Sequence, residues 1–173
     1  GADLGAEKFI DIKCRSAGIR PSAAVLVATI RALKFHGGVA RENLSEENLP
    51  ALRAGLANLN RHINNLREHY GVPAVVSINQ FVADTDAEVE LVMEHCKALG
   101  VQVALSSHWA NGGAGATDLA HMVAEICDAD TTPANTPHNS FVYPSELSLW
   151  EKLETVASKV YHASEITASS KVR

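Results

Sequence analysis

The sequence lacks the features of several protein classes. It carries 15 lysine and arginine residues against 20 aspartate and glutamate residues, a formal net charge of -5, and neither sign forms a long run. Nucleic-acid binding usually needs concentrated basic side chains, so a duplex-binding protein is not expected. No apolar stretch approaches the roughly 20 residues that span a bilayer, and no signal-peptide pattern is present. We therefore expect a soluble protein without a membrane partner.

The cysteine and histidine patterns give no sign of a disulfide framework or a metal site. The three cysteines, Cys14, Cys96 and Cys127, are odd in number and contain no C-x-x-C pair. The eight histidines form no H-E-x-x-H motif, and the G-x-S-x-G motif of serine hydrolases is also absent. We expect no metal and no serine nucleophile. The expected location is a reducing compartment, the cytoplasm, or the mitochondrion if the source is eukaryotic.

Apolar runs of strand length alternate with segments of helical periodicity. Valine-rich runs without polar alternation predict parallel strands, covered on both faces, at 23–30, 73–80 and 101–106. Apolar residues at steps of three and four predict helices at 46–70, 84–100, 116–129 and 145–164. This order predicts an α/β fold, a three-layer parallel sheet with flanking helices, of the P-loop-NTPase-like or Rossmann-like kind.

The pattern also predicts how the chain is divided. We expect an α/β sheet portion at 1–130 that carries the binding loops, a connection at 131–145, and a C-terminal helix and tail at 146–173. The chain opens without methionine inside a predicted helix, which suggests a piece of a longer polypeptide. In that helix Lys8, Lys13 and Arg15 alternate with Asp3, Glu7 and Asp11, and this spacing predicts surface ion pairs.

Ligands of open parallel sheets bind beyond the carboxyl ends of the strands. Phe81 and Trp109 follow the second and third predicted strands there, and two such rings can stack on a planar heterocycle. The alternative is that both rings cap the core beneath a helix. Asn79 and Asp84 offer an amide and a carboxylate that suit the edge of a base.

Glycines and basic residues occur in the same predicted loops. Gly112, Gly113 and Gly115 permit close backbone approach to an anion or a polar ligand edge, although turn geometry alone also explains them. After the first strand, Arg31 and His36 could attract phosphate or carboxylate, and His36 could change its protonation near neutral pH. For Lys34, which lies between them, the pattern favours a solvated helix position over anion binding.

Several blocks together resemble the formate–tetrahydrofolate ligase family. They are GADLGAEKFIDIKCR at 1–15, VATIRALKFHGG at 27–38, GVPAVVSINQFVADTDAE at 71–88 and SHWANGGAGATDLA at 107–120, and the likeness extends from residue 1 to about residue 166. The resemblance implies an ATP-dependent ligase that makes formyl phosphate from formate and ATP and transfers the formyl group to N10 of tetrahydrofolate. It also implies that Phe81 and Trp109 stack on the pterin ring, with Leu105 beside them.

The resemblance further implies which ligands and partners to expect. ATP with Mg²⁺, formate and tetrahydrofolate would be substrates, without a prosthetic group. The partners would be the remaining portion of the ligase polypeptide and further copies in a homo-oligomer. The family's phosphate-binding loop, G-x-x-x-x-G-K-[ST], is absent from these residues. We therefore expect no catalytic residue in this chain and no catalysis by the chain alone. Gln80 and His162 depart from the family pattern.

Two other functions are compatible with the residues. In a generic nucleotide-binding sheet, Asn79, Asp84 and Trp109 would hold adenine. In a structural or assembly module, the apolar helix at 46–70 would provide the contact surface.

Overall fold

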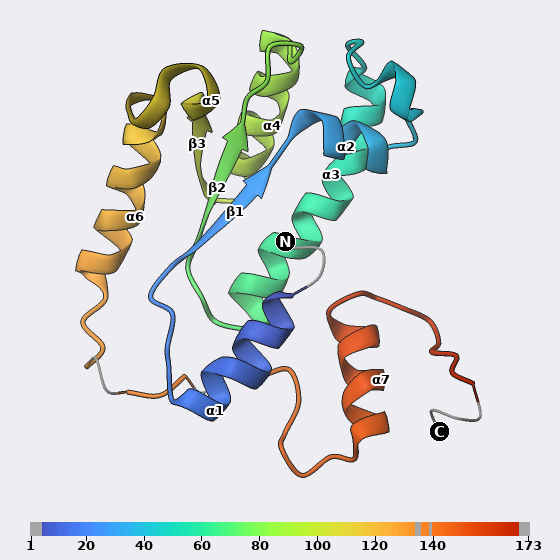
Figure 1. The fold of residues 1–173 in the computed structure, drawn as a ribbon, viewed down its shortest axis with the longest axis vertical. Helices are drawn as coiled ribbons and strands as arrows, with labels where there is room; N and C mark the ends of the chain where they lie inside the picture. Colours follow the sequence, from blue (N-terminus) through green and yellow to red (C-terminus); the bar gives the residue numbers. More distant parts are fainter. Residues whose placement is uncertain (1–4, 134–135, 139, 170–173) are drawn as a thin grey trace.

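The computed structural model describes residues 5–133, 136–138 and 140–169. Three strands, β1 (Ala24–Ala28), β2 (Ala74–Asn79) and β3 (Gln102–Ser106), form a parallel sheet in the order β1-β2-β3 (Figure 1). The α-helices are α1 (Arg15–Ala17), α2 (Ile30–His36), α3 (Leu49–Asn64), α4 (Asp86–Ala98), α5 (His108–Asn111), α6 (Thr117–Ala129) and α7 (Leu149–Lys159). Shorter 3-10 and π-helical segments are η1 (Lys8–Cys14), η2 (Arg41–Asn43), η3 (Asn65–His69) and η4 (Gly112–Ala116). The predicted α/β fold with a parallel sheet and flanking helices is confirmed, whereas its Rossmann-like or P-loop-like type stays a prediction.

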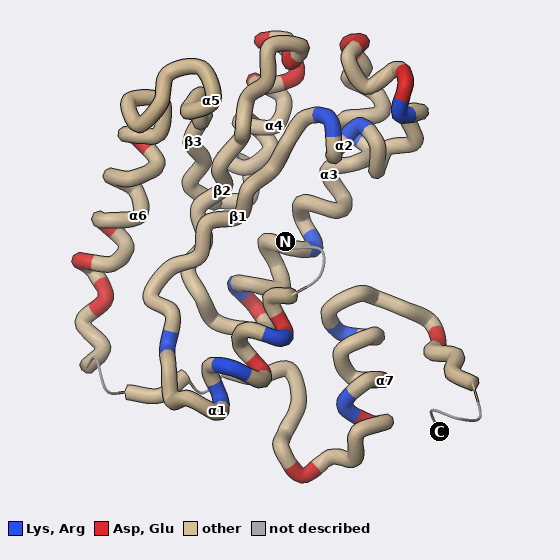
Figure 2. Tube along the Cα trace, viewed as in Figure 1, with Lys and Arg blue, Asp and Glu red and all other residues tan. Residues whose placement is uncertain are grey.

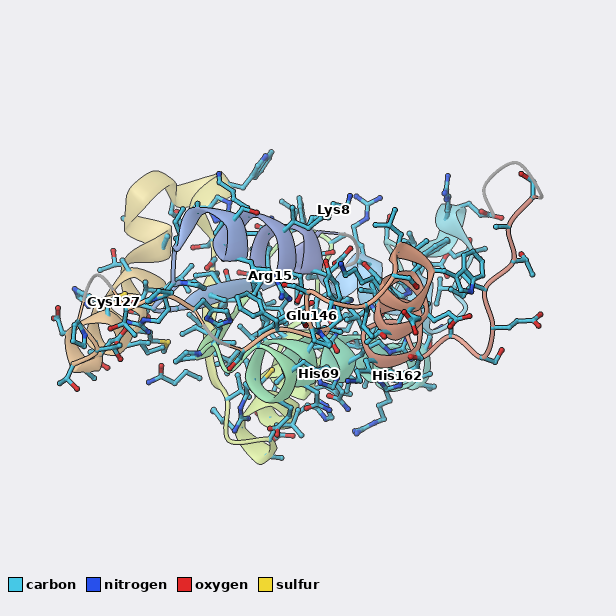
Figure 3. The ribbon with its side chains drawn as sticks, turned by 90° about the horizontal axis from the view of Figure 1, so that it is seen from below. Lys8, Arg15, His69, Cys127, Glu146 and His162 are labelled. Atoms are coloured by element: carbon cyan, nitrogen blue, oxygen red, sulfur yellow. The ribbon has the colours of Figure 1, made fainter. Side chains whose placement is uncertain are left out.

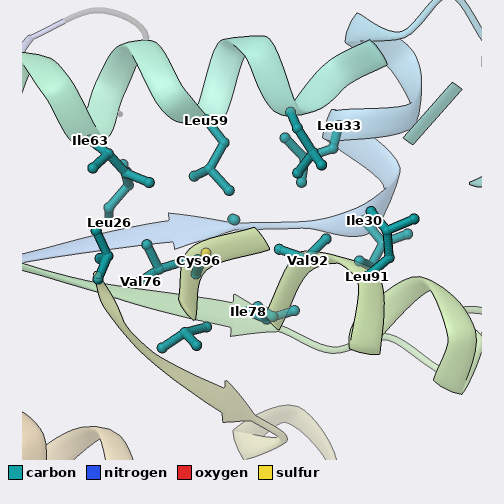
Figure 4. Close-up of a cluster of buried hydrophobic side chains, with 14 of the residues drawn as sticks. Leu26, Ile30, Leu33, Leu59, Ile63, Val76, Ile78, Leu91, Val92 and Cys96 are labelled. Carbon is teal, nitrogen blue, oxygen red and sulfur yellow. The ribbon is translucent and has the colours of Figure 1, made fainter. Parts of the chain in front are cut away.

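The main core lies between one face of the sheet and helices α2, α3 and α4 (Figure 4). Val76 and Ile78 of β2 and Val103 of β3 belong to this core. Because strand side chains alternate between faces, the buried residues Val75 and Ala104 point to the other face, where α6 contacts β2 and β3. Helices therefore cover both faces of β2 and β3.

The prediction that every strand is covered on both faces is wrong for β1. Leu26 and Ala28 are buried in the core, but Val25 and Val27, which point to the opposite face, are 42% and 59% exposed. Valine content alone could not show this, because it depends on which helix reaches which strand. Within the described residues, α6 reaches β2 and β3 and leaves this face of β1 open.

Local capping residues mark several helix ends. Thr85 and Glu88 form a capping box at the start of α4, and Gly71 and Gly100 adopt the positive φ angles, 61° and 65°, that end η3 and α4. The helix predicted at 46–70 is α3 followed by η3. The helix predicted at 145–164 is shorter, because α7 begins only after its cap at Ser148.

A second apolar cluster joins the N-terminal helix to the later part of the chain. It contains Ile10, Tyr70, Val72, Val142 and Val160. Within the described residues, each helix is too short or too polar to cross a membrane.

The prediction that the charged residues of the N-terminal helix lie on the surface is wrong for Asp11. Its side chain is 2% exposed and lies against this second cluster. Its carboxylate accepts hydrogen bonds from the Val142 amide at 2.8 Å and the Tyr70 hydroxyl at 3.1 Å. Arg15 does form the expected i,i+4 pair with Asp11 at 3.6 Å, and it also donates to Tyr143 and Ser145 of the later segment. Figure 3 labels Arg15 on the N-terminal helix and Glu146 on this later segment. Asp3 lies outside the described residues.

Candidate functional site

The carboxyl ends of β2 and β3 bring the two predicted aromatic loops to one edge of the sheet (Figure 1). Asn79 pairs with Ser106 at the end of the ladder, and the Gln80 amide donates to the Ser106 carbonyl at 3.0 Å. Phe81 follows directly and is half-buried, whereas Trp109 is 71% exposed. The adjacency of the two strands is confirmed. The binding role of Phe81, Trp109 and the 37%-exposed Leu105 stays a prediction.

Asp84 fixes the backbone that carries Phe81. Its Oδ2 accepts from the Phe81 amide at 2.8 Å, and its own amide donates to the Phe81 carbonyl at 3.0 Å. Burial raises the pKa of Asp84, because the charged form loses hydration there. Asp84 Oδ1 and Asn79 Oδ1 are both shielded from solvent and have no hydrogen-bond partner among the described residues. The end of β2 and the loop after it therefore hold two acceptor atoms, one on each side of Phe81 in the sequence, that this part of the chain does not satisfy.

The glycines after Trp109 are explained in part by backbone packing. Gly112 has a φ of 57°, which favours glycine. At Gly115 a Cβ atom would lie 2.6 Å from the Ser107 carbonyl carbon, and the Gly115 carbonyl accepts from the Ser107 amide at 3.0 Å. A Cβ at Gly113 would meet open space. This supports the turn-geometry interpretation for Gly115, and the prediction that a ligand approaches these glycines is untested.

Replacing Gly115 with alanine is expected to lower the free energy of unfolding by about 1–3 kcal/mol, because the added methyl group meets backbone that cannot rotate away. Urea denaturation measures the change. Gly113→Ala is the matched control and should change it by less than about 0.5 kcal/mol. Equal effects of the two substitutions would contradict the packing argument.

The basic residues after β1 do not act as one group. Arg31 lines a hollow that also contains Phe81. His36, the last residue of α2, lines a different hollow of about 210 Å³ with Leu59 and His62. The structure thus places Arg31 next to the loop that carries Phe81. His36 instead lies near Leu59 and His62 of α3.

The expectation of a solvated Lys34 is wrong, because this side chain is fully buried. Its Nζ lies 2.9 Å from Glu88 Oε1 and donates to the Glu46 carbonyl at 2.7 Å. Glu88 also accepts from the amides of Asn48 at 3.0 Å and Thr85 at 3.2 Å. Burial alone would raise the pKa of Glu88, but the hydrogen bonds from Lys34 and the two amides bring it below its ordinary value. Because Lys34 is engaged in this pair, it does not serve to bind an anion.

A sequence signal for this buried pair was present. Ile30, Leu33 and Lys34 lie at steps of three and four, so Lys34 shares the apolar face of α2. Its partner Glu88 occupies the N3 position of the capping box, three residues after the N-cap Thr85. Phe35 on α2 and Arg41 after it line the same hollow as Phe81 but carry no such signal, since the packing of α2 and the path of the turn after it bring them there.

Among the residues that the structure describes, no group of three or more histidine, cysteine, aspartate or glutamate side chains is placed to hold a metal ion. The three cysteines are all free, with Cys14 and Cys96 buried and Cys127 exposed. The sequence also contains no phosphate-binding loop.

Comparison with known proteins points to one family. The family model described as formate–tetrahydrofolate ligase matches residues 1–173. Proteins named formate–tetrahydrofolate ligase are similar over the whole chain, at 58% identity in Methylococcus capsulatus, 54% in Granulibacter bethesdensis and 53% in Rhizobium etli. The chain spans about 30% of the length of these relatives. This chain belongs to the formate–tetrahydrofolate ligase family.

Proposed function

We propose that this chain is the pterin-binding part of an ATP-dependent ligase that joins formate to tetrahydrofolate. In that reaction formate and ATP give formyl phosphate and ADP, and the formyl group then passes to N10 of tetrahydrofolate with release of phosphate. Phe81 and Trp109 would hold the two faces of the pterin ring, with Leu105 at its edge. Family membership supports the reaction, and the arrangement of strands supports the site.

The observation that carries the proposal is the exposure of Trp109 just after β3, the strand that pairs with β2, which Phe81 follows. Most tryptophans lose much of their surface in a folded protein, whereas this indole is 71% exposed at the carboxyl edge of a parallel sheet. The neighbouring strand delivers Phe81 to the same edge. Two rings on adjacent loops suit a flat heterocycle, since offset stacking adds about 0.5–1.5 kcal/mol per pair beyond area burial.

The chain alone is not expected to turn over substrate. It has no phosphate-binding loop to position the transferred phosphate, and no catalytic residue is assigned to it. The remaining portion of the ligase polypeptide would supply that function. We propose that it covers the open face of β1 at Val25 and Val27, since an apolar face of this kind usually marks a contact. Assembly into a homo-oligomer is part of the same proposal.

The pterin site is tested with folic acid as the probe. In a Trp150→Phe background, where Trp109 is the one tryptophan left, folic acid should quench the fluorescence. Phe81→Ala should weaken folic acid binding about tenfold, and Trp109→Ala, followed by calorimetry, should weaken it at least as much. Leu153→Ala, on the exposed side of α7, is the control and should change nothing. Unchanged binding in both ring variants would refute the proposed site.

A nucleotide base is the second candidate ligand, and the unpartnered oxygens of Asn79 and Asp84 favour it, because they could accept hydrogen bonds from an exocyclic amino group. ATP and folic acid distinguish the two candidates in the same fluorescence experiment. Quenching by ATP without quenching by folic acid would support the nucleotide.

A further inference from the structure

Phe81 forms one wall of a hollow that the aromatic site does not account for. The hollow has a volume of about 440 Å³, within the range of small-ligand sites, and it lies beyond the carboxyl end of β1. Its lining includes Thr29, Arg31, Phe35, Arg41, Leu44 and Phe81. We call it the arginine hollow.

The lining of the arginine hollow carries positive charge that no carboxylate in it balances. Arg31 and Arg41 are its charged lining residues, and neither forms an ion pair with another described residue. Glu42 follows Arg41 but is not a lining residue. Figure 2 shows the basic positions on α2 and on the turn that follows it, next to acidic ones further out. A ligand group of opposite charge would therefore be favoured inside.

The Arg41 side chain is held by a neighbouring ring, and the position of Arg31 is set by the start of α2. The Arg41 guanidinium carbon lies 5.5 Å from the centre of the Phe35 ring, a cation–π contact that leaves its N–H groups free to donate. Arg31 follows Ile30, which is fully buried in the core and so fixes the start of α2. Burial raises the pKa of Asp84, and the charge of Arg31 opposes that rise. Arg31 and Phe81 line the same hollow, which places Arg31 near the loop that carries Phe81.

The aromatic and charged walls together define a ligand chemistry. The apolar surface of Phe81, Phe35 and Leu44 suits a ring or its substituent, and the two guanidinium groups suit an oxyanion, which a guanidinium can bind with two N–H donors. We propose that the arginine hollow binds an oxyanion, carboxylate or phosphate, of a ligand that lies against Phe81. This inference rests on the proposed pterin site, because Phe81 belongs to both.

Two sources of the oxyanion fit the proposed reaction. Folates carry the carboxylates of their glutamate tail, and formyl transfer leaves inorganic phosphate. Three probes separate them. Folic acid has the ring and the carboxylates, 6-methylpterin has the ring alone, and inorganic phosphate has the oxyanion alone.

The test uses Arg31→Gln, Arg41→Gln and the double variant, with Arg53→Gln as the matched control, an exposed arginine of α3 outside the hollow. Fluorescence in the Trp150→Phe background follows folic acid and 6-methylpterin, and calorimetry follows phosphate. If the hollow holds the glutamate carboxylates, the double variant binds folic acid at least about tenfold more weakly, while its binding of 6-methylpterin is unchanged. If it holds phosphate, the double variant loses phosphate binding and keeps both pterin ligands. Circular dichroism shows whether each variant is folded.

The inference is overturned if the folded double variant binds folic acid and phosphate as the unchanged chain does, or if the Arg53 control loses as much. Failure of the proposed pterin site gives a different result, in which the unchanged chain binds neither pterin ligand. In that case the calorimetry with inorganic phosphate is the remaining test. Phosphate binding that depends on Arg31 and Arg41 supports an oxyanion site, and a lack of phosphate binding refutes it.

Discussion

Replacing Glu88 with glutamine is expected to lower the free energy of unfolding by about 3–5 kcal/mol, because it leaves the Lys34 ammonium charged and buried without its counter-charge. Lys34→Met should have an effect of similar size, since it leaves the Glu88 carboxylate uncompensated. The pair connects the last turn of α2 to the first turn of α4, and through the Asn48 amide it also reaches the start of α3. Loss of either charge therefore disturbs three helices of the main core.

The double variant Lys34→Met/Glu88→Gln shows how much of this loss comes from leaving one buried charge without its partner. It removes both charges together, so it should recover most of the stability that either single variant loses. Urea denaturation of the four proteins gives the coupling free energy. Glu90→Gln and Lys97→Met, both exposed on α4, are the controls and should each change stability by less than about 0.5 kcal/mol. Single variants at Lys34 and Glu88 that behave like these controls would show that the ion pair is not buried in solution.

Replacing Asp11 with alanine is expected to lower the free energy of unfolding by about 2–4 kcal/mol, because two buried donors, the Val142 amide and the Tyr70 hydroxyl, lose their acceptor. These contacts join the N-terminal helix to segments about 60 and 130 residues away in sequence (|i−j| of 59 and 131). Asp118→Ala, at an exposed position in the first turn of α6, is the control and should have a small effect. A loss below about 1 kcal/mol at Asp11 would contradict the role assigned to it.

Asp11 also predicts a dependence of stability on pH. Burial raises its pKa above the ordinary value of 3.8 despite the hydrogen bonds it accepts, so the folded chain binds its proton more tightly than the unfolded chain. The contribution of Asp11 to the free energy of unfolding therefore decreases as the pH rises from about 3.8 through the pKa of Asp11 in the folded chain. In Asp11→Asn that decrease should be missing, which denaturation at a series of pH values measures. An unchanged pH profile would show that Asp11 does not titrate in this range.

The site was predictable where local spacing decides it. Phe81 and Trp109 each follow a strand that the sequence marks clearly, and parallel pairing of β2 and β3 then brings their loops to one edge. The arginine hollow was not predictable, because Phe35 reaches Phe81 through the packing of α2, and Arg41 through a turn whose path depends on how α2 packs against α3. Lys34 was predicted to lie in solvent because lysine is charged, although its spacing places it on the apolar face of α2.

The sequence by itself determined the order of strands and helices, their capping residues and the family, since all of these follow from short-range patterns of apolar and turn-forming residues. The tertiary structure decided which charges are buried and which apolar residues are open. Asp11 and Lys34 are buried because partners distant in the sequence fold against them, and Val27 is exposed because α6 packs mainly against β2 and β3. Burial is a property of the neighbours that packing supplies, so a residue's own identity does not determine it.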